Sequence, residues 1–196
     1  MSVKNSNTTS DYLQWDSAMN LIHRLYKDKE YTMSLLIGCG CFFGLRISDL
    51  LSLKWCQILS EDGMFTLIEK KTGKRRTIKV NSNFKKHIED CHKALGIVDD
   101  DRPCFISRKG TVYTTQRINV KLKYIKVRYG LKMGNISTHF MRKTFGRKVF
   151  ESAGEQAEVA LVRLMELFNH SSVAITKRYL GIRQQELMAT YDLLDF

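Results

Sequence analysis

The sequence predicts a single α+β domain that is mainly α-helical and carries a small three-stranded antiparallel sheet. Apolar residues recur at helical spacing over much of the chain, most clearly in residues 31–43 and 157–168. Residues 55–80 shift towards a period of two, with glycine-containing turn pairs at 62–63 and 72–73. With 196 residues, 43% of them hydrophobic, the chain is long enough for one well-buried domain.

The first predicted elements follow a polar N-terminal tail, residues 1–15. Asp16 is a candidate N-cap for a helix that carries four apolar residues on one face, Ala18, Leu21, Ile22 and Leu25. Residues 31–43 are apolar nearly all round, which predicts a central buried helix. Gly44 ends this helix, so Arg46 is expected at the turn into the next one.

Two further amphipathic helices are expected after the sheet. The first has an apolar face formed by Phe84, His87, Ile88, Cys91 and Leu95, and Gly96 stops it. The second starts at Thr114 or Thr115, and its inward-facing residues are Ile118, Leu122, Ile125 and Tyr129. Its remaining faces are basic and suit contact with a polyanion.

The last third of the chain gathers side chains that suit phosphate chemistry. Thr138 is a natural N-cap, which places His139 in the first helical turn and Arg142 on the same face. The helix at 157–168 stops at Asn169, because asparagine tolerates the left-handed conformation. His170 then falls in a tight turn, and Ser171 or Ser172 caps a short helix that ends near Tyr179.

The charge of the chain favours a nucleic-acid partner. The formal net charge is +12, and the excess lies in two basic runs, residues 70–79 and 117–132. No apolar run reaches the roughly 18 residues of a membrane span, and the start has no signal-peptide pattern. We therefore expect no membrane partner. The candidate DNA-contacting residues are Lys70, Lys74, Arg75, Arg76, Lys121 and Lys143.

The five cysteines fit free thiols in a reducing cytoplasm, since their number is odd and most have apolar neighbours. His87, Cys91 and His92 have part of the spacing of a metal site, but no second Cys/His pair completes a closed zinc site. Residues 99–101 are three consecutive aspartates, which do not converge on one ion and predict a solvated turn. The sequence thus predicts no metal and no other cofactor.

His139-x-x-Arg142, the following helix, the run Asn169-His170-Ser171-Ser172, and a tyrosine nine residues beyond His170 resemble the catalytic half of the tyrosine recombinases, the phage integrase family. Upstream, the segment around Arg46 resembles the family's first arginine motif, and residues 70–74 resemble its hairpin lysine. Five elements in the family's order favour this reading. Taken singly, each has an ordinary interpretation, such as a packing tyrosine or a helix-end charge.

The resemblance implies roles for six residues. Tyr179 would be the nucleophile that forms a 3'-phosphotyrosine, and Arg46 and Arg142 would clamp the phosphate. His139 would assist proton transfer at the tyrosine, and His170 would donate to a non-bridging oxygen. Lys71 would protonate the leaving 5'-oxygen. Lys70 and Lys74 compete for that role, and Lys71 is chosen because it immediately precedes the 72–73 turn pair.

Asp49, three residues from Arg46, is a candidate to orient the guanidinium, with a surface ion pair as the alternative. Asn169 stands where the family usually has glycine. Family members generally carry a core-binding domain before the catalytic one, and only about fifteen residues precede the catalytic part here. The chain is therefore expected to be either similar to the single-domain fimbrial phase-switch recombinases or a catalytic fragment.

The expected domain covers residues 16–182, and the apolar spacing of Leu187, Tyr191 and Leu194 predicts a C-terminal helix within 183–196. Docking of this helix in cis is the default, and the resemblance implies docking on a neighbouring protomer. The expected function is site-specific recombination of double-stranded DNA without metal or ATP, by a homo-oligomer that is tetrameric at synapsis, with accessory DNA-bending proteins as possible partners. The expected setting is the cytoplasm and nucleoid of a bacterium, with a phage or mobile-element origin. Two alternatives remain: DNA relaxation of the type IB topoisomerase kind, and a catalytically idle DNA-binding accessory factor.

Overall fold

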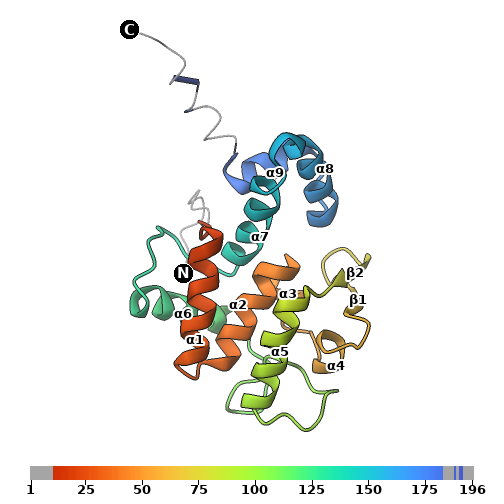
Figure 1. Cartoon of the computed structure of the whole chain (residues 1–196), viewed down its shortest axis with the longest axis vertical. Helices are drawn as coiled ribbons and strands as arrows, with labels where there is room; N and C mark the ends of the chain where they lie inside the picture. Colours follow the sequence, from red (N-terminus) through yellow and green to blue (C-terminus); the bar gives the residue numbers. More distant parts are fainter. Residues whose placement is uncertain (1–10, 183–187, 189, 192–196) are drawn as a thin grey trace.

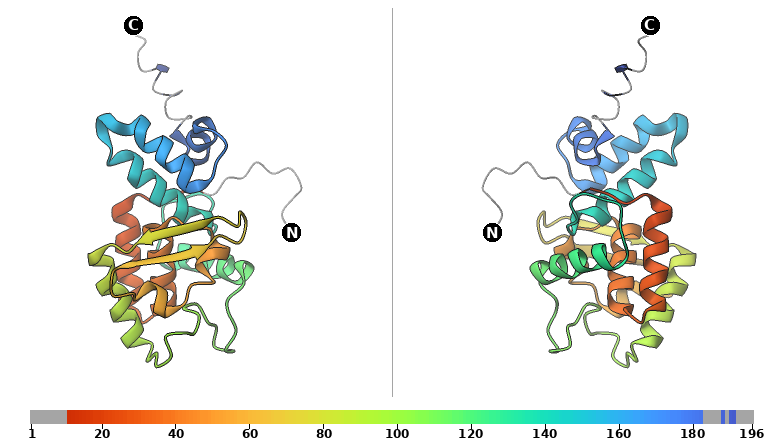
Figure 2. Two further views of the ribbon diagram at one scale, coloured as in Figure 1. Left: turned by 90° about the vertical axis from the view of Figure 1, so that its right-hand side faces the viewer. Right: turned by 90° about the vertical axis from the view of Figure 1, so that its left-hand side faces the viewer.

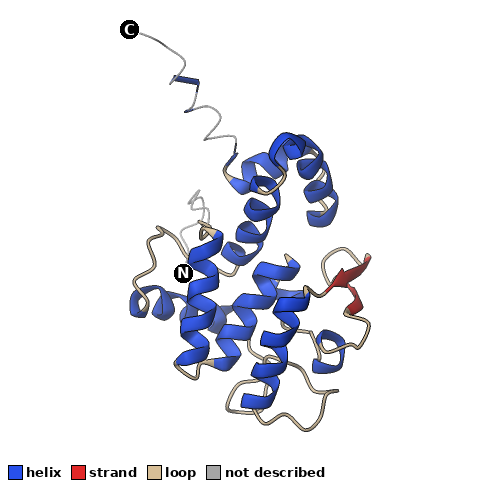
Figure 3. Cartoon of the chain, in the orientation of Figure 1, coloured by secondary structure: helices blue, strands red, loops and turns tan. Residues whose placement is uncertain are grey.

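The computed structural model describes residues 11–182, 188, 190 and 191. This part of the chain is mainly helical, with one small antiparallel sheet, as predicted (Figure 3). The helices and strands are α1 Trp15–Lys27, α2 Tyr31–Phe43, α3 Ile47–Leu50, α4 Trp55–Ile58, β1 Met64–Ile68, β2 Arg75–Lys79, α5 Ser82–Ala94, α6 Thr115–Arg128, α7 His139–Glu151, the 3-10 turn η1 Gly154–Gln156, α8 Ala157–Phe168 and α9 Val173–Leu180. The N-cap of α1 is Gln14, so Asp16 lies inside the first turn and is not the predicted cap.

Helix α2 is the centre of the core and packs against α1, α5 and α7 (Figure 1). Two glycines allow the close approach. A Cβ added at Gly38 would lie 2.5 Å from the ring of Phe84 on α5, and one at Gly40 would lie 2.5 Å from the sulfur of Met141 on α7. Helix α7 is therefore seated directly on the central helix, which gives a rigid base to the side chains that α7 carries.

The sheet has two strands in the described residues, and the prediction of a third was wrong. β1 and β2 pair antiparallel, with Phe65 opposite Ile78, and cross one face of the helical body (Figure 2). The segment that begins at Trp55 is the helix α4 instead. The side chain of Gln57 accepts the Lys54 N–H at 2.9 Å, and Trp55 and Ile58 are both buried at helical spacing. This local capping and the i, i+3 burial favour a helical turn over a strand.

Helices α8 and α9 form a separate layer with its own apolar cluster, which contains Leu161, Leu164, Phe168, Leu180 and Ile182. Both helices pack on α7, which links this layer to the main core (Figure 1). The N-terminal residues 1–10 and most of the predicted C-terminal helix, residues 183–187, 189 and 192–196, lie outside the described residues. Within the described part, no helix has the length and apolar character that crossing a membrane requires.

Candidate active site

All six side chains predicted to be catalytic line one open cavity of about 500 Å³. They come from the N-cap of α3, the β1–β2 turn, the start of α7, the α8–α9 turn and the end of α9. The lining residues are Arg46, Lys71, Thr72, Lys74, His139, Arg142, Asn169, His170 and Tyr179. Segments more than 100 residues apart in the sequence thus meet at this cavity, which lies between the main core and the α8–α9 layer.

Arg46 is held by two hydrogen bonds. Gly44 ends α2 in the left-handed conformation, with φ 58°, and Arg46 follows as the extended N-cap of α3. Its Nη1 donates to Glu69 Oε2 at 2.7 Å, and its Nη2 donates to the carbonyl oxygen of Phe168 at 3.0 Å. Asp49 was considered either to orient this guanidinium or to form a surface ion pair, and the structure shows neither arrangement among the described residues. The buried Asp49 instead accepts the backbone N–H of Lys70 at 2.9 Å and so anchors the hairpin.

Glu69 is a buried carboxylate between two arginines, and the sequence analysis missed it. It is 3% exposed and accepts from Arg46 at 2.7 Å, from Thr72 at 2.9 Å and from Arg76 at 3.5 Å. Burial alone would raise its pKa, but the hydrogen bonds of Thr72 and Arg46 and the two positive charges hold that pKa below its usual value. A carboxylate 23 residues from Arg46 gives no local sequence signal, because only the hairpin brings it there.

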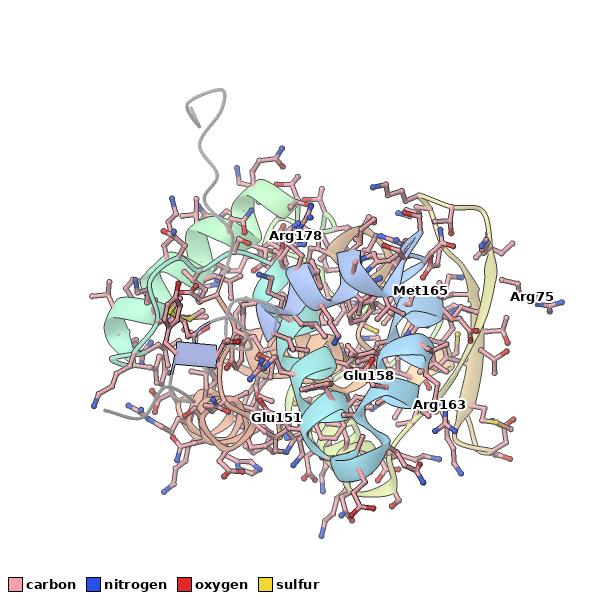
Figure 4. The ribbon with its side chains drawn as sticks, turned by 90° about the horizontal axis from the view of Figure 1, so that it is seen from above. Arg75, Glu151, Glu158, Arg163, Met165 and Arg178 are labelled. Carbon is pink, nitrogen blue, oxygen red and sulfur yellow. The ribbon has the colours of Figure 1, made fainter. Side chains whose placement is uncertain are left out.

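Arg76 was predicted to contact DNA, but the structure turns its guanidinium inward. Its side chain is 11% exposed. Besides Glu69, it donates to the carbonyl oxygen of Phe43 at 2.8 Å and to that of Leu167 at 3.3 Å. Arg76 therefore ties β2 to the ends of α2 and α8, while its neighbour Arg75 projects outward from the hairpin (Figure 4).

Arg142 is a buried cation with a spare donor. It is 4% exposed, its Nη1 donates to the carbonyl oxygen of Gly44 at 2.6 Å, and its guanidinium lies 4.2 Å from the ring centroid of Phe168. Its Nη2 is buried and has no hydrogen-bond partner in the described structure. Burial lowers the pKa of Arg142 to about 10, and the charges of Arg46 and Arg76 add to the shift. A desolvated, unpaired donor beside a cavity is poised for an anion.

Tyr179 lines the same cavity with an equally unpaired hydroxyl. Its ring packs against His170 and Phe168, with centroid separations of 5.3 and 5.6 Å, and its oxygen is buried without a partner among the described residues. Burial raises the pKa of Tyr179 to about 12, although Arg142 and Arg46 oppose the shift. The phenol is therefore protonated at neutral pH and has to lose its proton if it attacks phosphorus.

Lys143 was predicted to be a DNA-contacting residue, but its side chain is buried and packs against the ring of Tyr179. It is 8% exposed, and its ammonium lies 5.3 Å from the Tyr179 ring centroid, a cation–π contact. Burial lowers the pKa of Lys143. Its position on the α7 face that receives α9 could not be distinguished from an exposed one by sequence spacing.

The two candidate catalytic histidines are held differently: His170 through its ring, and His139 through its backbone N–H. His170 follows Asn169, which ends α8 in the left-handed conformation with φ 51°, and Ser172 rather than Ser171 caps α9 by accepting the Ile175 N–H at 3.2 Å. The Nδ1 of His170 lies 3.0 Å from Oγ1 of the buried Thr176. This contact fixes the imidazole ring, and the sequence did not predict it.

His139 is the first residue of α7. Thr138 occupies the N-cap as predicted, but its hydroxyl makes no capping bond; Ser137 Oγ accepts the His139 N–H at 3.3 Å instead. Burial, followed by the charges of Arg142, Lys143, Arg46 and Lys71, lowers the pKa of His139. Burial and the two arginines likewise lower the pKa of His170. The lowered pKa values favour the neutral imidazoles at pH 7, so either can accept a proton.

The hairpin brings two lysines to the cavity. Lys71 is exposed and lines it, as does Lys74, whose Nζ donates to Asn169 Oδ1 at 2.6 Å. Lys70 is not among the lining residues. On α6, Lys121 lies 5.6 Å from the ring centroid of Tyr113, outside this cavity. Lys71 and Lys74 thus remain the two candidates for a proton donor.

The two histidines of the metal site considered in the sequence, His87 and His92, contact different partners. His87 Nε2 lies 3.1 Å from Ser34 Oγ and 3.6 Å from Cys91 Sγ. His92 Nε2 instead lies 2.7 Å from Asp100 Oδ1. No group of three or more metal-ligating side chains occurs among the described residues. The fold therefore does not direct His87 and His92 at one point.

Comparison with known proteins shows the family of this chain. The Phage integrase family model matches residues 11–186. The chain is 27% identical over 149 residues to tyrosine recombinase XerC of Xanthomonas axonopodis pv. citri (strain 306), covering 76% of this chain and 46% of that protein. It is 31% identical over 176 residues to the probable integrase/recombinase YoeC of Bacillus subtilis (strain 168), covering 87% of this chain and 92% of that protein.

The same fold occurs in the XerH site-specific recombinase, solved bound to a palindromic difH substrate. The TM-score is 0.68 at 21% identity, over 97% of this chain and 56% of that one. The chain spans about half the length of the XerC relatives that it matches. Because the family model matches nearly the whole sequence, including residues 11–182 of the described part, the chain belongs to the phage integrase family.

Proposed function

We propose that this chain is the catalytic part of a site-specific DNA recombinase that cleaves and rejoins DNA through a 3'-phosphotyrosine. One observation carries the proposal: the unpaired Nη2 of Arg142 and the unpaired hydroxyl of Tyr179 are both buried beside the cavity that Arg46 also lines. A guanidinium that can bind an anion, close to a nucleophilic hydroxyl, suits attack on a phosphodiester.

In the proposed step, the Tyr179 oxygen attacks phosphorus, and a P–O bond to tyrosine forms as the P–O5' bond breaks. The phenolic proton passes to neutral His139, and the electron pair of the broken bond stays on O5', which takes a proton from Lys71. Arg46 and Arg142 bind the non-bridging oxygens, and His170 donates a hydrogen bond to one of them. The phosphotyrosine conserves the bond energy, so a 5'-hydroxyl of a partner strand reverses the step without ATP.

The proposed reaction needs no metal ion, because the two arginines and the lysine supply the positive charge that a metal supplies in other phosphoryl transfers. Covalent adduct formation in excess EDTA tests this point. We expect undiminished adduct yield. Loss of the adduct in EDTA, restored by magnesium, would contradict the proposed mechanism.

The proposed substrate is double-stranded DNA, consistent with the net charge of +12 and with the structurally similar Tn1549 transposon integrase, which was solved in complex with transposon right end DNA. We further propose that the protein acts as a homo-oligomer, tetrameric at synapsis and assisted by accessory DNA-bending proteins, in the bacterial cytoplasm and nucleoid. The docking of residues 183–196 on a neighbouring protomer belongs to the same proposal. Deleting residues 184–196 should spare DNA binding by one protomer and impair multimer formation on paired sites.

Two alternatives use the same domain. A type IB topoisomerase-like enzyme would relax supercoiled plasmid that carries no paired sites, whereas a recombinase exchanges strands only between sites. A catalytically idle accessory factor would bind DNA and form no covalent adduct. The reactive set that lines the cavity favours an enzyme over the idle factor. Product analysis on supercoiled plasmids with and without paired sites separates the three.

A further inference from the structure

Three cations from the main core meet the C-terminal end of α8. Arg46 Nη2 donates to the carbonyl oxygen of Phe168 at 3.0 Å, and Arg76 Nη1 donates to that of Leu167 at 3.3 Å. The third contact differs, because Lys74 Nζ donates to a side chain, Asn169 Oδ1, at 2.6 Å. The end of a helix carries partial negative charge, so this is a favourable place for cations.

The acceptor of Lys74 lies on the turn that presents the candidate catalytic residues of the α8–α9 layer. Asn169 is in the left-handed conformation, with φ 51° and ψ 50°. Its N–H donates to the Glu166 carbonyl oxygen at 3.0 Å, and the N–H of His170 donates to that of Met165 at 2.9 Å. The backbone of Asn169 is therefore held by α8, while its side-chain oxygen reaches the hairpin.

The donor lies on the turn that carries Lys71. The Glu69 N–H donates to the Lys74 carbonyl oxygen at 2.9 Å, and the Lys74 N–H donates to Thr72 Oγ1 at 3.3 Å. On the other side of Lys71, the Lys70 N–H is anchored on Asp49. Lys71 is exposed and lies between these two anchors, so the freedom of its turn depends on them.

We propose that Lys74 and Asn169 form a clasp that positions Lys71 for proton transfer, by locking the β1–β2 turn to the α8–α9 layer that carries Tyr179. Lys74 and Asn169 are positioning residues in this account, and Lys74 acts through Asn169 instead of through a DNA phosphate. The inference rests on the proposed cleavage reaction and names a part of it that the six catalytic candidates do not contain.

Two single variants break the clasp from opposite sides. Asn169→Gly removes the acceptor and keeps the left-handed backbone, which glycine adopts freely. Lys74→Met removes the ammonium and keeps most of the aliphatic chain. Lys79→Met is the matched control, because it removes one lysine charge from strand β2 of the same hairpin at an exposed side chain that is not among the candidate DNA-contacting residues.

The readout is single-turnover cleavage of a nicked suicide substrate at saturating DNA, with either oxygen or sulfur at the bridging 5' position. Sulfur leaves without a proton, so a misplaced proton donor matters for the oxygen substrate alone. Each clasp variant should slow cleavage of the oxygen substrate roughly tenfold, the usual effect of losing one charge-assisted hydrogen bond. The double variant should be no slower than either single variant, because both remove the same contact.

On the sulfur substrate, all three clasp variants should cleave at the rate of the unmodified protein. Lys79→Met should keep the unmodified protein's ratio of sulfur to oxygen rates. Multiplicative effects in the double variant, or equal slowing on both substrates, would overturn the clasp. So would a loss of several hundredfold in Lys74→Met that sulfur restores while Asn169→Gly cleaves normally, since Lys74 would then be the proton donor itself. If the unmodified protein forms no adduct on either substrate, the proposed function fails and this inference fails with it.

Discussion

The guanidinium of Arg142 lies 4.2 Å from the ring centroid of Phe168, the last residue of α8. The carbonyl oxygen of the same phenylalanine accepts a hydrogen bond from Arg46, and its ring packs edge-on against His170 and Tyr179. One fully buried apolar residue thus joins both candidate phosphate-binding arginines to the layer that carries the nucleophile. Packing and hydrogen bonding around Phe168 thus place the arginines and the tyrosine relative to one another.

Arg142→Met should stabilise the DNA-free protein and strongly slow cleavage. Arg142 is a buried cation with an unpaired donor, and its lowered pKa means that the folded state disfavours its charge. Replacing it with an apolar side chain of similar length should increase the free energy of unfolding by on the order of 1–3 kcal/mol. Cleavage should fall by at least about 10²–10³-fold, the usual effect of losing a transition-state donor.

Urea unfolding and single-turnover cleavage measure these two effects of the Arg142 substitution. Arg142→Lys is the control, since it keeps a charge without the planar fork and should gain no stability. A strongly destabilised Arg142→Met protein would show that the hydrogen bond to Gly44 outweighs the cost of burying the charge.

Arg75 and Arg76 are neighbours with opposite expected effects. Arg75 is exposed, so Arg75→Ala should reduce the slope of log affinity against log salt by about 0.9, the share of one phosphate contact, with no change in unfolding. Arg76→Ala removes a hydrogen-bond donor from Glu69 and from two backbone carbonyl groups. It should therefore lower the free energy of unfolding by about 3 kcal/mol. DNA binding titrations at several salt concentrations and thermal unfolding measure both. Equal effects of the two substitutions would refute the inward placement of Arg76.

Acidification from pH 7 to pH 5 should destabilise the DNA-free protein. The folded-state pKa values of His87, His139 and His170 all lie below 6.5, so the unfolded chain binds protons first as the pH falls. The stability that the neutral histidines contribute is present above pH 6.5 and is lost as the pH falls through their folded-state pKa values. Glu69 acts in a lower window, because its folded-state pKa lies below that of an ordinary glutamate.

The histidine variants allow this pH effect to be assigned. A His139→Gln/His170→Gln double variant should lose less stability between pH 7 and pH 5 than the unmodified protein, and His87 should account for part of the remainder. Urea unfolding at both pH values provides the measurement. An unchanged pH dependence in the double variant would mean that neither imidazole near the cavity is held neutral by the fold.

Local patterns in the sequence predicted most helices well. The buried helix at 31–43, its stop at Gly44 and the left-handed cap at Asn169 are confirmed, because they depend on apolar periodicity and on residues that tolerate positive φ. The prediction of a third strand was wrong. A four-residue helix with a side-chain cap is too short for its helical spacing to be distinguished from the alternating spacing of a strand.

The sequence named six candidate residues that meet in one cavity, but it did not predict the contacts that hold them there. The six candidates were named through a family resemblance, and the structure gathers them in one cavity. The buried partners Glu69 and Thr176 and the inward turn of Arg76 and Lys143 all depend on contacts between distant segments. Spacing along one helix or strand contains no information about such contacts, and an arginine on a hairpin has the same local pattern whether it faces solvent or the core.

The most direct test of the account is to trap the covalent intermediate on a nicked suicide substrate and to identify the tyrosine that carries the DNA. The account predicts a 3'-phosphotyrosyl adduct on the peptide that contains Tyr179. It also predicts that Tyr179→Phe binds the same DNA with nearly unchanged affinity and forms no adduct, because that substitution removes the hydroxyl alone. An adduct that persists in Tyr179→Phe, or that maps to another of the eight tyrosines, would contradict the assignment of the nucleophile.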